Sequence, residues 1–139
     1  MGAVDLMKSM MIAASGLQAQ SGRMRVIAEN IANAESTARV AGGDPYRRQV
    51  PTFQEKLNRE LGVPTVSIGR PIGDTSEFKL KYMPGHPAAD ENGYVKMPNV
   101  NTMVEAMDMR EAQRSYEANL NLIQASRRMI AQTIELLKK

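Results

Sequence analysis

The apolar residues of this chain follow a helical spacing at both ends and lose it in the middle. All seven prolines lie between Pro45 and Pro98, so both flanks are free of proline. Proline in a helix interior costs about 3 kcal/mol. The partition therefore predicts two long helices, from Asp5 to Asn33 and from Thr102 to Lys138, on either side of a turn-rich middle.

The N-terminal flank carries its apolar residues at alternating intervals of four and three positions. This spacing is typical of a coiled-coil seam. Gly16 and Gly22 lie within the flank, and each costs about 1 kcal/mol relative to alanine in a helix. The predicted seam is therefore weak, and its members are Leu6, Met10, Ala13, Leu17, Gln20, Met24, Ile27, Ile31 and Ala34.

The C-terminal flank opens with Thr102 and Glu105 in a capping-box pattern, in which each side chain can satisfy an otherwise unpaired backbone amide. The same spacing by four and three follows, interrupted by the polar residues Gln113 and Arg127. The members of this second seam are Met109, Gln113, Tyr116, Leu120, Ile123, Arg127, Ile130, Ile134 and Leu137.

The two predicted helices can pair only with each other, or their stripes can also contact other subunits. Two narrow seams bury too little surface to hold a chain of 139 residues firmly, so we favour the second interpretation. It assigns subunit packing to Leu17, Met24, Ile27, Ile31 and Asn33 on the first helix, and to Tyr116, Leu120, Ile123, Ile130, Ile134 and Leu137 on the second.

The middle region, residues 37–99, shows only short strand signals. We predict strands within Tyr46–Phe53, Thr65–Gly69, Glu77–Met83 and Tyr94–Met97, of which only the third alternates cleanly between apolar and polar residues. The expected fold class is mainly α with a small β region. Residues 1–36 and 100–139 are expected to form one discontinuous coiled-coil domain around the middle region.

The run PGHPAADENGYVKMPNVN, residues 84–101, contains the only histidine of the chain. A metal site at His86 needs further ligands, and the chain has no other histidine and no cysteine. Asp90 and Glu91 do not follow the spacing of an EF-hand loop, and no nucleophile elbow accompanies the histidine. We therefore expect no catalytic residue, no metal and no cofactor here.

The same run is better explained as a shaped connector. Prolines fix the backbone on both sides of the Gly-His pair, and Asn-Gly is a turn dipeptide. The run is expected to lead the chain from the β region into the second helix at a set angle. Its connector and capping residues are Pro84, Gly85, Asn92, Gly93, Pro98, Thr102 and Glu105.

Asn30 and Asn33 form a second polar feature near the end of the first predicted helix. Asn33 can end that helix in a left-handed conformation, or it can bond backbone groups of a neighbour. The alternative is a solvated helix end, and the sequence leaves both possibilities open.

Composition narrows the function classes further. The chain has 18 basic and 15 acidic residues, so its surplus of positive charge is small and argues against nucleic acid as the main partner. No segment approaches the roughly 20 apolar residues of a membrane span. The apolar run MMIAA near the start is shorter than the core of a cleaved signal peptide. No glycine-rich phosphate loop appears.

Four motifs, taken in order, resemble the bacterial flagellar axial rod and hook protein family, and within it the proximal rod proteins most closely. They are IAENIANAEST, GGDPYRRQVPTF, the run PGHPAADENGYVKMPNVN and MVEAMDMREAQRSYEANLNLIQASRRM. The first is shared by axial proteins generally, whereas the third and the SYEANL of the fourth are closer to the proximal rod. The resemblance covers nearly the whole chain.

This resemblance implies a structural subunit without catalysis, which assembles helically, transmits torque and lines the export channel of the flagellar basal body. It implies other copies of the chain, other rod proteins, the adaptor protein FliE and the flagellar type III export apparatus as partners. It also implies export without a cleaved signal peptide into a rod that spans the periplasm. The alternative is a soluble or secreted helical adaptor that binds one partner through the same stripes.

Overall fold

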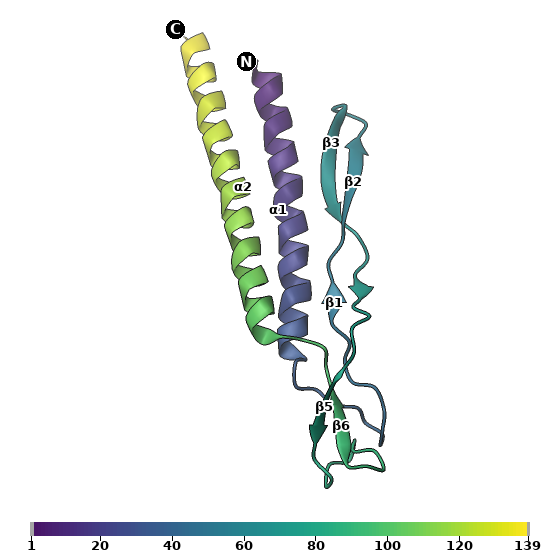
Figure 1. Ribbon diagram of the computed structural model, residues 1–139. Helices are drawn as coiled ribbons and strands as arrows, with labels where there is room; N and C mark the ends of the chain where they lie inside the picture. Colours follow the sequence, from purple (N-terminus) through teal and green to yellow (C-terminus); the bar gives the residue numbers. More distant parts are fainter. Residues whose placement is uncertain (1, 139) are drawn as a thin grey trace. The chain divides into compact units, whose positions relative to one another are not determined.

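The computed structural model describes residues 2–138, which form two long helices and three two-stranded sheets (Figure 1). Helix α1 spans Ala3–Ala32 and helix α2 spans Thr102–Leu137. Both predicted helices are therefore confirmed to within two residues at each end. The mainly α fold with a small β region in the middle of the chain is also confirmed.

The chain divides into two compact units, and each helix contributes to both. The described part of unit 1 comprises residues 2–24, 52–70 and 110–138, and unit 2 comprises residues 25–51 and 71–109. The predicted domain boundaries near residues 36 and 100 remain a prediction. We describe the units separately below.

In unit 1, β2 (Phe53–Asn58) and β3 (Val63–Ile68) form an antiparallel hairpin. Its turn needs a left-handed backbone at Gly62, where φ is 65°, a region that glycine enters without a steric penalty. The side-chain oxygen of Asn58 accepts hydrogen bonds from the amides of Glu60 and Leu61, at 3.0 and 3.3 Å. These local bonds fix the hairpin register.

The helices of unit 1 contact each other through small residues. A Cβ atom built on Gly16 would lie 2.9 Å from the side-chain nitrogen of Asn119, so the Asn119 side chain packs on the bare backbone of Gly16. Arg23 and Glu111 form an ion pair at 3.6 Å. The buried side chains are also small: Ala13, Ala19, Ala112 and Ser126.

The line of greatest burial on α2 differs from the predicted seam. Glu105, Ala112, Asn119 and Ser126 follow one another at seven-residue intervals and are buried or half-buried. A helix turns about 100° per residue, so the predicted seam residues lie beside this line. The predicted coiled-coil pairing is not confirmed, because the contacts between helices that the structure shows involve small and polar side chains.

Unit 2 holds two short sheets. Strand β1 (Gln49–Val50) pairs with β4 (Ile72–Gly73), and β5 (Lys79–Tyr82) pairs with β6 (Tyr94–Met97). The rings of Tyr82 and Tyr94, which are cross-strand partners, meet edge to face at 5.2 Å between centroids. The apolar core of this unit consists of Val26, Ile27, Ala88, Val95, Pro98 and Val100.

The predicted strands are found, most of them with shifted bounds, and two strands, β2 and β4, were missed. Tyr94–Met97 is observed as predicted, and the segments at Glu77–Met83 and Thr65–Gly69 contain or overlap β5 and β3. The predicted Tyr46–Phe53 strand is interrupted at Pro51, which has no amide to donate. Strand β2 was not predicted because its sequence, FQEKLN, does not alternate cleanly between apolar and polar residues.

Candidate functional site

The most connected group of side chains in unit 2 is a hydrogen-bonded cluster that we call the polar junction. It brings together the end of α1, strand β1, the segment after β4, the connector before α2 and the first turns of α2. Its members are Asn30, Tyr46, Arg48, Gln49, Asp74, Asn99 and Glu105.

Asn30 lies at the centre of the polar junction and is fully buried. Its side-chain oxygen accepts hydrogen bonds from the Tyr46 hydroxyl at 2.6 Å and the Gln49 amide at 2.9 Å. Its side-chain nitrogen donates to the Gln49 carbonyl at 2.8 Å and to Glu105 at 3.4 Å. An asparagine amide has two donors and an acceptor with two lone pairs, so every hydrogen-bonding position of Asn30 is used.

Glu105 is a buried carboxylate on α2, and Arg48 neutralises it. The Nε atom of Arg48 donates to one oxygen of Glu105, while Asn30 donates to the other. A buried carboxylate is tolerated in a protein when it is both paired and hydrogen-bonded. Glu105 therefore stabilises unit 2 only while Arg48 and Asn30 remain in place.

Arg48 extends the polar junction to two further carboxylates. Its Nη1 atom lies 3.2 Å from Asp74, and its Nη2 atom lies 3.7 Å from Asp108. The planar guanidinium offers donors in a fixed fork, which suits three acceptors in different directions. Its hydrogen bond with Glu105 raises the pKa of Arg48, against the opposing effect of burial.

Asn99 ties the connector to both neighbouring segments. Its side-chain oxygen accepts from the backbone amide of Arg48 at 2.7 Å. Its side-chain nitrogen donates to the carbonyl of Asp74 at 3.1 Å and to Ser76. The end of the sequence run 84–101 is thereby anchored to the residue before β1 and to the segment after β4.

Two other members of the polar junction have shifted pKa values. The amide and hydroxyl of Ser76, together with Arg48, lower the pKa of Asp74. Burial, followed by the negative charges of Glu29 and Glu105, raises the pKa of Tyr46. At neutral pH the carboxylate is therefore ionised and the phenol is protonated, which are the forms that the observed hydrogen bonds need.

The polar junction is a structural joint. Its polar atoms are mutually satisfied, and among residues 2–138 no buried side-chain nitrogen or oxygen lacks a partner. Within the same residues, no three His, Asp or Glu side chains are arranged to hold a metal ion. Neither described helix is apolar over a length sufficient to cross a bilayer.

The start of α2 corrects the predicted capping box. The cap is Asn101, whose side-chain oxygen accepts from the amides of Met103 at 3.1 Å and Val104 at 3.4 Å. Thr102 is instead the first residue of the helix. Glu105 does not turn back to the cap, because its carboxylate bonds Arg48 and Asn30.

The loop at residues 83–93 is organised by hydrogen bonds to its own backbone. His86 Nδ1 accepts from the amide of Ala88 at 3.0 Å. Asp90 accepts from the amides of Asn92 and Tyr94, each at 2.9 Å. Gly93 adopts a φ of 84°. These contacts support the connector assignment for Pro84, Gly85, Asn92, Gly93 and Pro98, of which Gly93 and Pro98 are buried.

The predicted packing residues of α1 have different exposures. Ile27 is buried, Leu17 and Met24 are half-buried, and Ile31 is 38% exposed. Asn33 follows the helix end and donates a hydrogen bond to the carbonyl of Glu29 at 2.8 Å. It does not end the helix in a left-handed conformation, since positive φ angles within residues 2–138 occur at glycines alone.

The predicted packing residues of α2 form a partly covered stripe. Tyr116, Ile123 and Ile130 are half-buried. Leu120, Ile134 and Leu137 are 38%, 51% and 82% exposed. Their assignment to subunit packing remains a prediction, since the structure contains a single chain.

Sequence reasoning missed Arg48, Asp74 and Asn99, and it left the role of Asn30 open. Asn30 had been noted as an unusual polar residue near a helix end, and its burial rules out the solvated alternative for this residue. The partners lie far away in sequence: Arg48 and Glu105 are 57 positions apart. No local pattern could have paired them.

The long helices carry exposed apolar residues, which are typical of surfaces that contact other proteins. Comparison with known proteins identifies the family. The family described as "Flagella basal body rod protein" matches residues 10–39. The family described as "Flagellar basal body rod FlgEFG protein C-terminal" matches residues 91–136.

Relatives that match most of the chain identify the family more closely. The flagellar basal-body rod protein FlgC of Agrobacterium fabrum is 53% identical over 127 residues, covering 91% of each chain. FlgC of Aquifex aeolicus is 39% identical over 135 residues, covering 97% of this chain and 99% of the relative. FlgC of Salmonella typhimurium is 41% identical over 127 residues, covering 90% and 92%.

The chain therefore belongs to the flagellar basal-body rod protein FlgC family. It is a structural rod subunit and not an enzyme. The resemblance read from the four sequence motifs is confirmed, and the comparisons give no support to a single-partner adaptor.

Proposed function

We propose that this rod subunit forms part of the proximal rod, where it assembles helically with copies of itself and with other rod proteins. In this assembly it transmits torque and lines the export channel. Contacts that repeat head to tail without closing generate helical structures of this kind. The two long helices supply surfaces that extend along such an assembly.

The observation that carries the proposal is the exposed apolar stripe of α2. Leu120, Ile134 and Leu137 are 38–82% exposed, next to half-buried Tyr116 and Ile123. Exposed apolar surface of this extent in a soluble subunit marks a protein contact. The fully buried residues of unit 1 are alanines and a serine, so its large apolar side chains keep exposed surface for neighbours.

The neighbours in this proposal are other copies of the chain, other rod proteins, the adaptor protein FliE and the flagellar type III export apparatus. The subunit would be exported without a cleaved signal peptide and reside in the rod across the periplasm. Support comes from the family membership and from the exposed apolar residues on both helices.

Asn33 and the run 84–101 have supporting roles in this proposal. The connector residues fix where α2 begins relative to the β strands of unit 2, since Asn99 bonds Arg48 and Asn101 caps the helix. A defined start positions the apolar stripe that follows. Asn33, together with Leu17, Met24, Ile27 and Ile31, would contribute the α1 side of the packing.

The experiment replaces Leu120 with aspartate in cells that carry no other copy of the gene. A buried unpaired charge in a subunit contact is costly, so we expect loss of motility and of rods in purified basal bodies. Ile123→Asp should have the same effect. Asn121→Asp adds the same charge at an exposed position of α2 outside the predicted stripe and should leave motility near normal.

Secreted and cytoplasmic levels of each variant are measured alongside motility. Leu120→Asp protein that is made and exported but absent from basal bodies supports the subunit contact. Normal basal bodies and full motility with Leu120→Asp would contradict it.

A further inference from the structure

The β2–β3 hairpin of unit 1 has little internal stabilisation. It is a two-stranded sheet, and such hairpins are marginal in water unless another element packs against them. All β2 residues except Asn58 are exposed. Its order must therefore come mainly from contact with α1.

That contact is a close fit between one glycine and one isoleucine. A Cβ atom built on Gly22 of α1 would lie 2.7 Å from Cδ1 and 3.1 Å from Cγ2 of Ile68. Both branches of the isoleucine side chain thus approach the bare backbone of Gly22. Each staggered χ1 rotamer of Ile68 leaves one branch on the side of Gly22, so a larger residue at position 22 forces a shift of the Ile68 side chain or of the hairpin.

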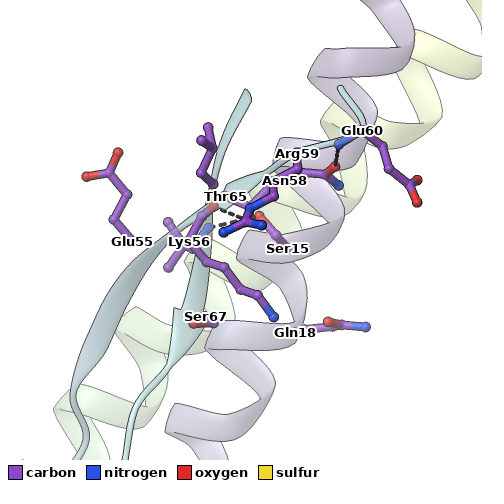
Figure 2. A pocket seen from close by; sticks show the side chains of 11 residues that line it. Ser15, Gln18, Glu55, Lys56, Asn58, Arg59, Glu60, Thr65 and Ser67 are labelled. Atoms are coloured by element: carbon purple, nitrogen blue, oxygen red, sulfur yellow. Dashed lines mark hydrogen bonds between the residues drawn. The ribbon is translucent and has the colours of Figure 1, made fainter. Parts of the chain in front are cut away.

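A single hydrogen bond adds to this contact. The amide of Val66, on the outer edge of β3, donates to the hydroxyl of Ser15 on α1 at 3.2 Å. Farther toward the hairpin tip, a groove of about 950 Å³ is lined by α1 and the hairpin. Figure 2 shows Ser15 and Gln18 on the helix and Lys56, Asn58 and Arg59 on the hairpin.

The base of the hairpin has the features of a hinge. The strand register shifts by one residue between Val50↔Ile72 and Phe53↔Ile68, as at a β-bulge. Pro51 and Pro71 flank the hairpin in the sequence and lack amides for a continuous ladder.

Within the hairpin, the base is closed by a second close approach. Gly69 donates its amide to the carbonyl of Thr52 at 2.7 Å. A Cβ atom on Gly69 would lie 2.6 Å from the Thr52 hydroxyl. The two strands are therefore held together at residues 52 and 69, next to the interrupted ladder, so the hairpin can move as one piece.

We propose that the β2–β3 hairpin is a hinged strap, held against α1 by the packing of Ile68 on the bare backbone of Gly22. Opening of the strap bends the chain at the bulge beside Pro51 and Pro71, while the hairpin itself and unit 2 keep their own hydrogen bonds. Gly22 is a positioning residue for the strap, and its cost to helix propensity is offset by the close fit that it permits.

The test is hydrogen exchange of backbone amides in the purified full-length chain, read at residues 53–68. Gly22→Ala forces a methyl group against Ile68, and overpacking of this kind destabilises a contact clearly. We expect hairpin amides, including that of Val66, to exchange at least about tenfold faster. Amides of unit 2 around Asn30 and Gln49 should exchange as in the wild type.

Gly16→Ala is the matched control. It makes the same substitution in the same helix, but the new methyl group meets the end of the Asn119 side chain instead of the hairpin. Both variants gain the same helix propensity, so circular dichroism should show unchanged or higher helicity in both. Only Gly22→Ala should accelerate hairpin exchange.

Ile68→Val in the Gly22→Ala background removes Cδ1, the atom nearest to the new methyl group, and should restore part of the protection. Three results would overturn the proposal: unchanged hairpin exchange in Gly22→Ala, no recovery in the double variant, or equal acceleration throughout unit 2. A wild-type hairpin that exchanges like an unfolded peptide would also overturn it.

Discussion

The side-chain amide of Asn30 pairs with Gln49 through both backbone groups of that residue, donating to its carbonyl and accepting from its amide. Strand β1 is bonded to β4 through its register Gln49↔Gly73 and Val50↔Ile72. The Asn30 side chain therefore forms with Gln49 the pair of backbone hydrogen bonds that a neighbouring strand would otherwise form. One buried side chain joins the end of α1 to the β region of unit 2.

Asn30→Asp tests this joint with almost no change in shape. The substitution replaces a donor by a carboxylate oxygen facing the Gln49 carbonyl and Glu105, and places a second charge beside a buried carboxylate. Breaking such a buried network costs about 3 kcal/mol or more. We expect a loss of this size in the free energy of unfolding, measured by urea titration at pH 7.

Asn33→Asp is the matched control for that measurement. Asn33 lies three positions on, is half-buried, and donates one side-chain hydrogen bond within its own helix end. A loss below about 1 kcal/mol is expected. If both variants lose the same free energy of unfolding, the four hydrogen bonds of Asn30 do not stabilise unit 2 more than the single bond of Asn33 does.

Arg48→Lys tests the three-way ion pairing. Lysine keeps the positive charge but lacks the planar fork that reaches Glu105, Asp74 and Asp108. Hydrogen bonds to charged groups contribute about 1.5–3 kcal/mol each, so we expect a loss of about 2 kcal/mol by urea unfolding. The exposed Arg128→Lys should change stability by less than about 0.5 kcal/mol.

Asp74 gives the polar junction a pH dependence of defined sign. Ser76 and Arg48 lower its pKa from the ordinary 3.8. A carboxyl with a lowered folded pKa contributes stability above its unfolded pKa and loses it as the pH falls through the folded value. Asp74→Asn should therefore be less stable than the wild type at pH 7, and the difference should shrink below about pH 4.

Urea titrations at pH 7, 5, 3 and 2 measure this difference. Glu117→Gln, at an exposed position of α2, provides the control for a general loss of negative charge. A wild-type advantage over Asp74→Asn that stays constant down to pH 2 would contradict the assigned pairing.

The helices were predictable from the sequence because their signals are local. Absence of proline over the flanks and the turn residues around Asn33 and Asn101 set their ends. Strand β6 was predicted with its observed bounds, since Pro98 follows it directly. Strand β2 was not, because polar Glu55 lies between Phe53 and Leu57 on the same face and breaks the apolar alternation.

The polar junction was largely beyond local pattern reading. Thr102 and Glu105 match a capping box in sequence, but Arg48 and Asn30 attract the carboxylate of Glu105 more strongly than a helix amide at its own cap. Likewise, the predicted seam followed large apolar residues, whereas a close contact between the helices lies at Gly16 and Asn119. In both cases the observed contacts join residues that are far apart in the sequence.

The start of α2 offers a direct comparison between the predicted and the observed cap. Asn101 accepts from two amides of the first turn, so Asn101→Ala should lower the free energy of unfolding by about 1 kcal/mol. Thr102 is exposed at the first helical position, and Thr102→Ala should change it by less than about 0.5 kcal/mol. Urea unfolding of both variants measures the contrast. Equal losses, or a larger loss for Thr102→Ala, would indicate that Thr102 is the helix cap. In that case Glu105 would be expected to complete the capping box instead of binding Arg48.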